Sequence, residues 1–457
     1  MSLTQLDRNA FGLTPDDGGH PAGHRAWNLN ARHDPALTVV AEEVEDIQRA
    51  VRFARSADLG VAVMATGHGT GVPCVGGVLV DTSPMRRVEI NPVARLARVE
   101  AGAIWGDVVP AAARHGLVGL PGSSLTVGVV GYTLGGGFGW LGRRYGLAAH
   151  SVVRAEVVTV DGELVAASAY ERPDLFWALR GGTGNFGIVT ALEFALYPVS
   201  TVYAGNLYYP LERARAVAEH YAEWSRAAPV ELTSALTFRR FPPAAAMPEP
   251  LRGRSLLAVR GCFAGDLVAG KALVDQARAA LGPAAVDTFA PMPAADLAAI
   301  SLDPVDPLPV LNHSELLADL TPAAIDALVE LGGSDSRSPL VMLEARQLGG
   351  ALAGPPGALS PLAHSGARFS VNAIGMTATP EQGSAVRAHL ERVERVLRPH
   401  VTGETYLNFL DLGGATPARV RAAYSDADWQ RLVALKERYD PTGVFRFNRN
   451  IPTTPRK

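Results

Sequence analysis

Cysteine and charge are both scarce in this sequence. Only two of its 457 residues are cysteines, Cys74 and Cys262, which is too few for a disulfide framework in a chain of this size. Charged residues make up 19% and the formal net charge is −3, so electrostatics give no reason to expect nucleic-acid binding. Hydrophobic residues make up 47%, which excludes a disordered chain.

Long apolar runs are absent as well. No stretch reaches 18 uncharged apolar residues, so we expect no membrane-spanning helix. The first residues, MSLTQLDRNAF, have neither the basic nor the apolar region of a signal peptide. These absences favour a cytoplasmic protein, and the chain length favours two or three lobes rather than a single core.

Glycine, by contrast, is abundant and unevenly placed. Residues 60–190 contain 24 of the 47 glycines. Glycine is favoured where the backbone takes a positive φ or approaches another group closely, so we expect a ligand in this part of the chain. Four glycine loops suit one, at residues 64–71, 99–102, 120–139 and 182–190, because successive N–H groups in such turns bind a pyrophosphate without a lysine.

Hydrophobic periodicity predicts an α+β chain with two textures. In the first 200 residues short strands alternate with glycine loops, and a helix is expected within 37–59. From about residue 203 longer elements follow. Helices are predicted at 212–227, 266–281, 322–331 and 380–398. Strands are predicted at 232–239, 255–263, 339–346, 367–377 and 404–410.

One tidy motif is rejected. Gly137, Gly139 and Gly142 form a G-x-G-x-x-G, and Asp161 follows about 20 residues later, which by pattern is a dinucleotide fingerprint. That fingerprint needs a strand before it and a helix after it. Here glycines interrupt both sides, and Asp161 falls in a predicted hairpin turn, so we do not expect this type of NAD(P) site.

Several segments taken in order carry a family resemblance. They read GVAVMATGHGTG, RVEAGAIWGDV, TVGVVGYTLGGGFGWLGRRYGLAAHSVV, DLFWALRGGTGNFGIVT, TYLNFLDL and LKERYDPTGVFRFNRNIP. This series closely resembles the berberine-bridge-enzyme-like flavoprotein oxidases, which have the vanillyl-alcohol-oxidase (PCMH) type of FAD-binding fold. The resemblance runs from about residue 27 to residue 452.

The resemblance implies a two-lobed α+β architecture with FAD between the lobes. It divides the chain into a PCMH-type FAD-binding domain at 1–201 and a substrate-binding domain at 202–401, where an antiparallel sheet is backed by helices. A berberine-bridge-like segment at 402–457 returns to the first domain. The implied activity is that of an FAD-linked oxidase with a small-molecule substrate and O2.

In this family the histidine of the first glycine loop carries FAD covalently, and here that position is His68. The alternative is that His68 packs beside non-covalent FAD. Family members often have arginine four residues earlier, where Met64 stands, which weakens the expected pyrophosphate contacts. A second link, when present, comes from a cysteine ten residues before the L-G-G-G run, where this chain has Ser124. A serine hydroxyl is a poor nucleophile, so one covalent link is expected.

The resemblance also implies which other residues bind FAD, in the glycine loops, at the start of one strand and near the C-terminus. They are Met64, Ala65, Thr66, Gly67, Gly69, Thr70, Gly122, Ser123, Gly128, Gly135, Gly136, Gly139, Gly187, Ile188, Val189, Asn408, Asn448 and Asn450. We expect no metal ligands. Cys74 is expected to be a small buried residue.

The family's usual catalytic base is missing. The motif Tyr-x-Asn-Tyr reads Tyr406-Leu407-Asn408-Phe409 here, and phenylalanine takes no proton. If this segment is a strand, Tyr406 and Asn408 share one face and hold the flavin ring.

Three residues are candidates for the catalytic role: Glu344, Tyr132 and Tyr406. Glu344 lies on a predicted strand with Met342 and Arg346 on the same face, and burial would raise the pKa of its carboxyl into a useful range. The alternative is a structural ion pair with Arg346. Asn372 and His313 are weaker candidates, and both fit structural roles as well.

The expected reaction is hydride transfer from a small organic substrate to flavin N5, followed by reoxidation with O2. Loss of the tyrosine base favours a substrate that is already acidic, such as a phenol or β-dicarbonyl of secondary metabolism. A flavin dehydrogenase, a carbohydrate or alcohol oxidase and a non-catalytic flavin-binding protein remain alternatives.

Overall fold

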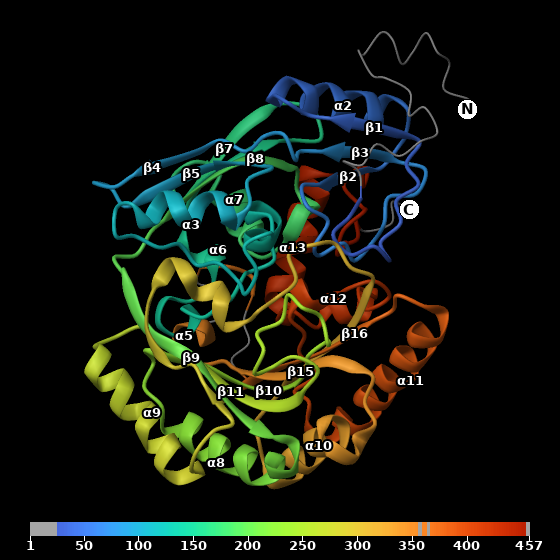
Figure 1. Cartoon of the computed structure of the whole chain (residues 1–457). Coiled ribbons are helices and arrows are strands. Elements are labelled where there is room, and N and C mark those ends of the chain that lie inside the picture. The colour runs from blue at the N-terminus through green and yellow to red at the C-terminus, as the bar shows by residue number, and fades with distance from the viewer. Residues whose placement is uncertain (1–24, 355–358, 363–365, 454–457) are drawn as a thin grey trace.

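Two lobes make up the chain (Figure 1). The computed structural model describes residues 25–354, 359–362 and 366–453. The first eleven residues, on which the signal-peptide prediction rests, lie outside them. The upper lobe in Figure 1 contains the strands β1 to β8, and the lower lobe contains β9 to β16. Both helices and antiparallel sheets are present, which confirms the α+β class.

The upper lobe has two sheets. A parallel three-stranded sheet has the order β1-β3-β2, and an antiparallel five-stranded sheet has the order β4-β5-β8-β6-β7. The strands are β1 (Leu37–Val40), β2 (Val61–Met64), β3 (Val78–Asp81), β4 (Val88–Asn91), β5 (Leu96–Glu100), β6 (Val152–Val158), β7 (Leu164–Ser168) and β8 (Ile188–Ala195). The helices are α2 (Val44–Ser56), α3 (Trp105–Ala113), α4 (Val129–Leu134), α5 (Gly142–Tyr145), α6 (Ala148–Ser151) and α7 (Pro173–Leu179).

Helix α2 shows how sequence sets local structure in this lobe. Its predicted apolar stripe is buried, with Ile47, Ala50 and Val51 fully covered. The Asp46 carboxylate accepts a hydrogen bond from the N–H of Glu43 at 3.1 Å, which satisfies a donor that the helix start leaves free.

The lower lobe is one antiparallel sheet with helices on its outer face (Figure 1). Its order is β12-β9-β11-β10-β15-β16-β14, and β13 also pairs with β9. The strands are β9 (Thr201–Pro210), β10 (Leu232–Arg240), β11 (Ser255–Phe263), β12 (Val286–Asp287), β13 (Ala290–Pro293), β14 (Val310–Leu317), β15 (Leu340–Gln347) and β16 (Phe369–Met376). The helices are α8 (Ala214–Ala227), α9 (Leu267–Leu281), α10 (Pro322–Gly332) and α11 (Pro380–Leu397).

Alternation along β15 assigns the two faces of this sheet. Leu343 and Ala345 belong to the core that the sheet forms with its helices. Glu344 and Arg346 therefore point to the inner face, toward the upper lobe, because successive strand residues face opposite ways.

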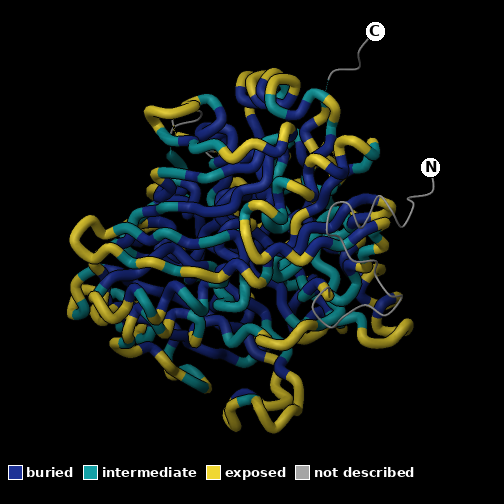
Figure 2. Tube along the Cα trace, turned by 90° about the horizontal axis from the view of Figure 1, so that it is seen from above, coloured by how far each residue is buried: buried dark blue, intermediate teal, exposed yellow. Residues whose placement is uncertain are grey.

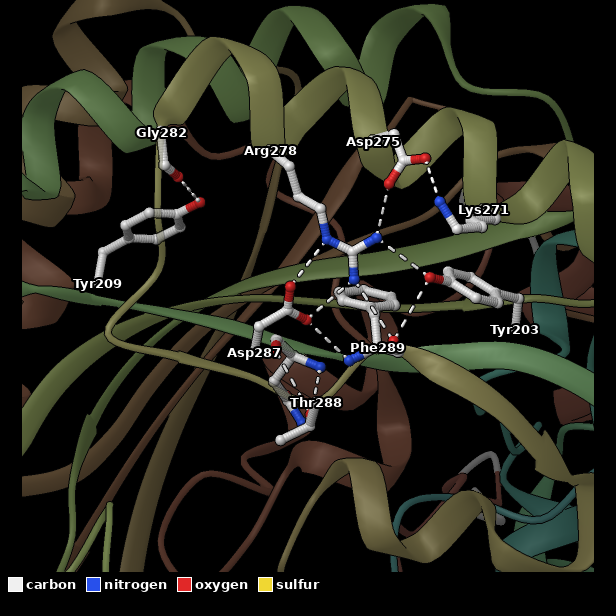
Figure 3. Close-up of polar contacts among 10 residues, drawn as sticks. Tyr203, Tyr209, Lys271, Asp275, Arg278, Gly282, Asp287, Thr288 and Phe289 are labelled. Atoms are coloured by element: carbon white, nitrogen blue, oxygen red, sulfur yellow. Dashed lines mark hydrogen bonds and ion pairs between the residues drawn. The ribbon is translucent and has the colours of Figure 1, made fainter.

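Helix α9 is tied to the sheet edge by Arg278 (Figure 3). The Arg278 guanidinium donates to Asp287 at 2.8 Å and to the Tyr203 hydroxyl at 3.1 Å. It also donates to Asp275 of the same helix at 2.8 Å. These partners raise the pKa of Arg278 above its ordinary value, first through the hydrogen bond to Asp287, so the side chain remains a permanent cation between helix and edge strands.

The C-terminal segment lies between the lobes and returns to the upper one. It contains α12 (Pro417–Arg421) and α13 (Asp426–Tyr439). The prediction of a strand at 404–410 is wrong, because Leu407–Phe409 forms a 3₁₀ turn. Side chains, rather than the backbone of a neighbouring strand, form hydrogen bonds with this turn. Asn312 and Ser314 donate to the Phe409 carbonyl at 3.0 and 3.2 Å.

Burial is greatest inside each lobe, whereas exposed residues cluster at turns and on outer helices (Figure 2). Among the described residues, no helix is both long and apolar enough to cross a membrane. The same residues contain no group of three or more His, Cys, Asp or Glu side chains arranged to bind a metal ion.

Candidate functional site

Loops that are distant in sequence meet on the upper lobe. The loop after β2, at residues 64–71, lies against the C-terminal tail, because the Arg449 guanidinium donates to the carbonyls of Gly69 and Leu410 at 3.0 and 2.7 Å. The loop before β8 joins the same group, since Asn448 donates to the Gly184 carbonyl at 3.1 Å. The structure therefore brings together His68, Asn448 and the glycine loops that the sequence singles out.

His68 lies in the first of these loops and is half-buried. Its ring stacks on Trp27, with 4.2 Å between ring centroids. Burial lowers the pKa of His68 from 6.5 to about 4, so the imidazole is neutral near pH 7. Its Nδ1 atom is buried and has no hydrogen-bond partner among the residues that the structure describes. A buried polar atom normally has a partner, so His68 is prepared for a group outside the chain.

Several glycines are required by the protein's own packing. Gly67 has φ of 67°, and a Cβ there would meet the backbone of Ala26. A Cβ at Gly139 would overlap the Pro121 carbonyl, and one at Gly135 would overlap the Asn408 side chain. These glycines position the loops rather than leave open space for a ligand.

The other residues predicted to bind the cofactor have different surroundings: some form hydrogen bonds within the loops, some are buried in the cores, and others border the loops or are exposed. The Thr66 carbonyl accepts from the Trp27 N–H at 2.9 Å, and the Thr70 hydroxyl donates to the Gly67 carbonyl at 3.2 Å. Met64, Ile188 and Val189 are buried in the cores, and Asn450 is exposed. The half-buried or buried residues Ala65, Gly122, Ser123, Gly128, Gly136 and Gly187 border the same loops.

Gly69 differs from these packed glycines. The nearest atom to a Cβ built at Gly69 is 3.7 Å away, in Arg449. Nothing in the protein's own packing demands glycine at this position. A molecule bound against the loop would occupy the space that a side chain at Gly69 could otherwise take.

Buried polar atoms without a hydrogen-bond partner among the described residues indicate whether this surface could hold FAD. They include His68 Nδ1, the Tyr132 hydroxyl, Asp411 Oδ1, Asn448 Oδ1 and Arg449 Nε. All five belong to the segments that meet here or to the turn beside them. A ligand rich in polar atoms and ring nitrogens would satisfy such a set, and the site therefore fits FAD.

Asp411 and Trp27 are site residues that sequence reasoning missed. Asp411 accepts a hydrogen bond from the Asn28 side chain at 3.0 Å, and burial raises the pKa of its carboxyl. Trp27 covers His68. Asp411 lies inside the quoted segment TYLNFLDL, so its position was a usable signal, whereas nothing local marks Trp27.

Tyr406, Asn408 and Tyr132 form a connected group at the junction of the lobes. The Asn408 amide donates to the Tyr132 carbonyl at 2.8 Å and to the Tyr406 hydroxyl at 3.2 Å. The Tyr406 hydroxyl also accepts from the Phe138 N–H at 3.1 Å. The predicted sharing of one side by Tyr406 and Asn408 is therefore present, although the segment is a turn.

The tyrosines are not tuned as bases. Burial raises the pKa of Tyr406 to about 12 and holds the pKa of Tyr132 well above its ordinary value. Phe409 packs against the Tyr406 ring with 5.0 Å between the ring centroids, whereas residues three apart in a strand would face opposite sides.

The predicted rise in the pKa of Glu344 is wrong. Burial alone would raise it, but the guanidinium groups of Arg346 and Arg260 outweigh burial and lower it. Arg346 pairs with Glu344 at 2.7 Å and Arg260 at 2.6 Å. The structural ion pair left open as the alternative is present. Arg260 was missed because its partner lies 84 residues away in the chain.

The two weaker candidates have protein partners. His313 pairs with Glu315 at 2.7 Å, and Asn372 accepts from the Asn312 amide at 3.4 Å. Of the remaining sequence candidates, Ser124 shares a hydrogen bond with Thr126 at 2.9 Å.

Known proteins agree with this geometry. Residues 35–168 match a family model described as an FAD binding domain, and residues 405–452 match one described as berberine and berberine like. An FAD-linked oxidoreductase of Dictyostelium discoideum is 26% identical over 94% of this chain and 91% of its own length. (R)-6-hydroxynicotine oxidase of Paenarthrobacter nicotinovorans is 36% identical over 40% of this chain and 41% of its own.

A solved structure extends the likeness to the whole fold. 6-Hydroxy-D-nicotine oxidase of Arthrobacter nicotinovorans superposes with a TM-score of 0.84 at 25% identity, covering 96% of this chain and 97% of the other. The chain is thus an FAD-linked oxidoreductase with a PCMH-type fold. Within that class it is similar to the berberine-bridge-enzyme-like flavoproteins, because residues 405–452 match the berberine-like family model.

Proposed function

We propose that this chain is an oxidase that holds FAD through one covalent bond to His68 and oxidises a small, acidic organic molecule with O2. The observation that carries the proposal is the half-buried, neutral His68 ring, whose buried Nδ1 has no partner among the described residues. A neutral imidazole is the nucleophilic form, so this ring is suited to bond formation with an electrophilic carbon.

A single attachment is supported by the residue at the second position. Ser124 has a hydroxyl that already shares a hydrogen bond with Thr126, and it lacks the thiolate that would make a cysteine reactive there.

Bound FAD would supply the hydride acceptor and, when reduced, the electrons for O2. The chain's own residues would hold and orient the reactants. Asn408 links the turn at Leu407–Phe409 to α4 through the Tyr132 carbonyl, so this turn is held against the glycine-rich segment that contains α4. The junction is buried, which excludes water from the reacting atoms.

No predicted catalytic side chain is a strong base near neutral pH. The pKa values of both tyrosines are raised, and Glu344 is a weak base because its two arginine partners lower its pKa. A substrate that ionises by itself needs no such base. This supports a phenolic or polyketide-type compound of secondary metabolism over a simple sugar alcohol.

We also propose that the protein is cytoplasmic. Cys74 and Cys262 are both free and buried, and unpaired cysteines are usual in the reducing cytoplasm.

Acid precipitation tests the covalent bond directly. Yellow colour should stay in the wild-type pellet and be lost from that of His68→Ala, while Ser124→Ala should remain yellow. A colourless wild-type pellet removes the proposal of a covalent bond. Colour that persists in His68→Ala would show a second attachment.

The acceptor is tested by mixing the reduced protein with air in a stopped-flow instrument. Rapid reoxidation with release of H2O2 is expected of an oxidase. Slow reoxidation together with rapid electron transfer to an artificial acceptor would instead make the chain a dehydrogenase. Rapid H2O2 production from oligosaccharides, with none from phenolic compounds, would overturn the substrate class.

A further inference from the structure

The inner face of the lower-lobe sheet carries a buried ionic cluster of Arg260, Glu344 and Arg346. Their side chains are 3%, 4% and 6% exposed. Arg260 and Arg346 each hold one carboxylate oxygen of Glu344, at 2.6 and 2.7 Å. The Thr237 hydroxyl donates to the same carboxylate at 3.0 Å, so Glu344 has no capacity for a further strong partner.

This cluster has one positive charge in excess, because two guanidinium groups share a single carboxylate. The neighbouring Arg239 does not change the balance, since it faces Asp303 at 3.9 Å. An unpaired buried charge is costly unless a counter-charge accompanies it. The cluster is therefore arranged to receive one further anion.

Arg346 presents the open edge of the cluster. Its Nε and Nη2 atoms both point at Glu344, whereas its Nη1 atom has no hydrogen-bond partner within the described ranges. Its guanidinium lies over the ring of Trp140 at 4.7 Å and that of Phe138 at 5.8 Å. Both rings come from the upper lobe, so Arg346 faces the junction where the reactants belong.

Ser370 provides a second, independent donor at the same place. It lies directly opposite Arg346 in the pairing of β15 with β16, and opposite residues of paired strands project from the same face. Ser370 is 1% exposed, and its hydroxyl has no hydrogen-bond partner in the described part of the chain. A free guanidinium edge and a free hydroxyl thus adjoin each other in the interior.

We propose that Arg346 and Ser370 bind an anionic group of the substrate, such as a carboxylate or an ionised phenol or enol. Guanidinium groups bind oxyanions through short, charge-assisted hydrogen bonds. The inference rests on the proposed oxidase function and narrows its substrate to a small organic anion. A rival acceptor for the charge is the flavin itself, which becomes anionic on reduction.

Titration of the holoenzyme with benzoate and with benzamide tests the charge preference. The two probes share shape but differ in charge, and binding is followed by the change in flavin absorption. Wild type should bind benzoate more tightly. Arg346→Met should weaken benzoate binding about ten- to a hundredfold, which is the value of a charged hydrogen bond, and should leave benzamide binding unchanged.

Three further variants sharpen the result. Arg346→Lys keeps the charge and should restore part of the preference, and it replaces Arg346→Met if that variant fails to fold. Ser370→Ala should weaken benzoate binding a few fold. Arg240→Met is the matched control, because Arg240 donates to the Gly332 carbonyl and Ser336 hydroxyl on the outer side of the same sheet.

Equal binding of the two probes by wild type would overturn the proposal, as would a preference that survives Arg346→Met. A shift in flavin reduction potential without a change in benzoate binding would assign the charge to the reduced flavin. Calorimetric titration repeats the comparison without a flavin signal. Charge preference in a protein that never forms H2O2 would refute the oxidase function alone.

Discussion

Two polar regions, one in each lobe, are built in opposite ways. The His68 ring is neutral, and the loops around it are shaped by backbone and glycine. On the lower lobe the groups are charged side chains from separate strands, such as Arg260 and Glu344. The first arrangement suits a large cofactor held for the lifetime of the protein, whereas the second suits a small charged ligand that comes and goes.

Charged side chains also lie in the region around His68, at Arg449 and in the pair of Lys436 and Asp440, and breaking that pair should give the largest effect. Lys436 and Asp440 form a fully buried pair beneath the upper loops, and Lys436 also donates to the carbonyls of Asn185 and Phe445, both at 2.8 Å. Lys436→Met strands the Asp440 charge and should cost about 3–5 kcal/mol, together with loss of bound FAD. Thermal unfolding and flavin absorbance measure both.

The matched control for that variant is Lys271→Met. Lys271 pairs with Asp275 on the surface of α9 at 2.6 Å, and such exposed pairs contribute about 0–1 kcal/mol. Equal losses from the two lysine variants would contradict the role assigned to Lys436.

Glu344→Gln tests the charged region and should cost about 3 kcal/mol, because it leaves two arginines without their counter-charge. The pKa of Glu344 is depressed in the folded chain, so its contribution is present above its unfolded pKa of about 4.3 and is lost as pH falls through the folded value. The variant should lose less stability than wild type on acidification below about pH 4. Denaturant melts over pH 3–7 check this, and an unchanged flavin reduction rate would eliminate Glu344 as the base.

Two glycine variants separate packing from cofactor contact in the region around His68. Gly139→Ala should destabilise the chain by about 1–3 kcal/mol, because its Cβ would overlap the Pro121 carbonyl. Gly69→Ala has room within the protein and should fold normally yet lose FAD affinity. Melting curves and flavin retention distinguish them, and a Gly69→Ala protein with full FAD binding would place the cofactor elsewhere.

The smallest expected effect is that of pH on the covalent attachment of FAD to His68, which should not change between pH 8 and pH 5. The pKa of His68 is about 4, so the ring stays neutral through pH 8 to 5. Because the fraction of neutral His68 is nearly constant over this range, the amount of FAD that the apoprotein binds covalently should be constant as well. It should fall only near pH 4. Acid-stable flavin after incubation at each pH measures it. A midpoint near 6.5, the ordinary value for histidine, would show that burial does not tune His68.

The glycine loops around His68 could be found from the sequence, because each loop is a short local motif and the loops follow one another in a recognisable order. The predicted helices in the second half are present at nearly the same bounds, as α8 and α11 show. Strands β9 and β14 were not predicted, since their burial depends on partners far along the chain.

The charged region could not be read in the same way. Arg260, Glu344 and Ser370 come from three strands, and only the register places them together. The alternation of side chains along a strand correctly placed Glu344 and Arg346 on one face. The expected effect of burial, however, gave the wrong direction for the pKa of Glu344. That direction depends on Arg260, whose position relative to Glu344 is fixed by tertiary pairing alone.

The return of the C-terminal tail has a consequence for synthesis in the cell. The Asn185 side chain accepts from the Ile451 N–H at 2.9 Å, and the Val61 N–H donates to the Val444 carbonyl at 2.8 Å. Strand β2, which begins at Val61, is thus synthesised some 380 residues before its partner Val444. A chain that ends before residue 444 would lack both contacts, so completion of this part of the structure requires the last segment to be synthesised.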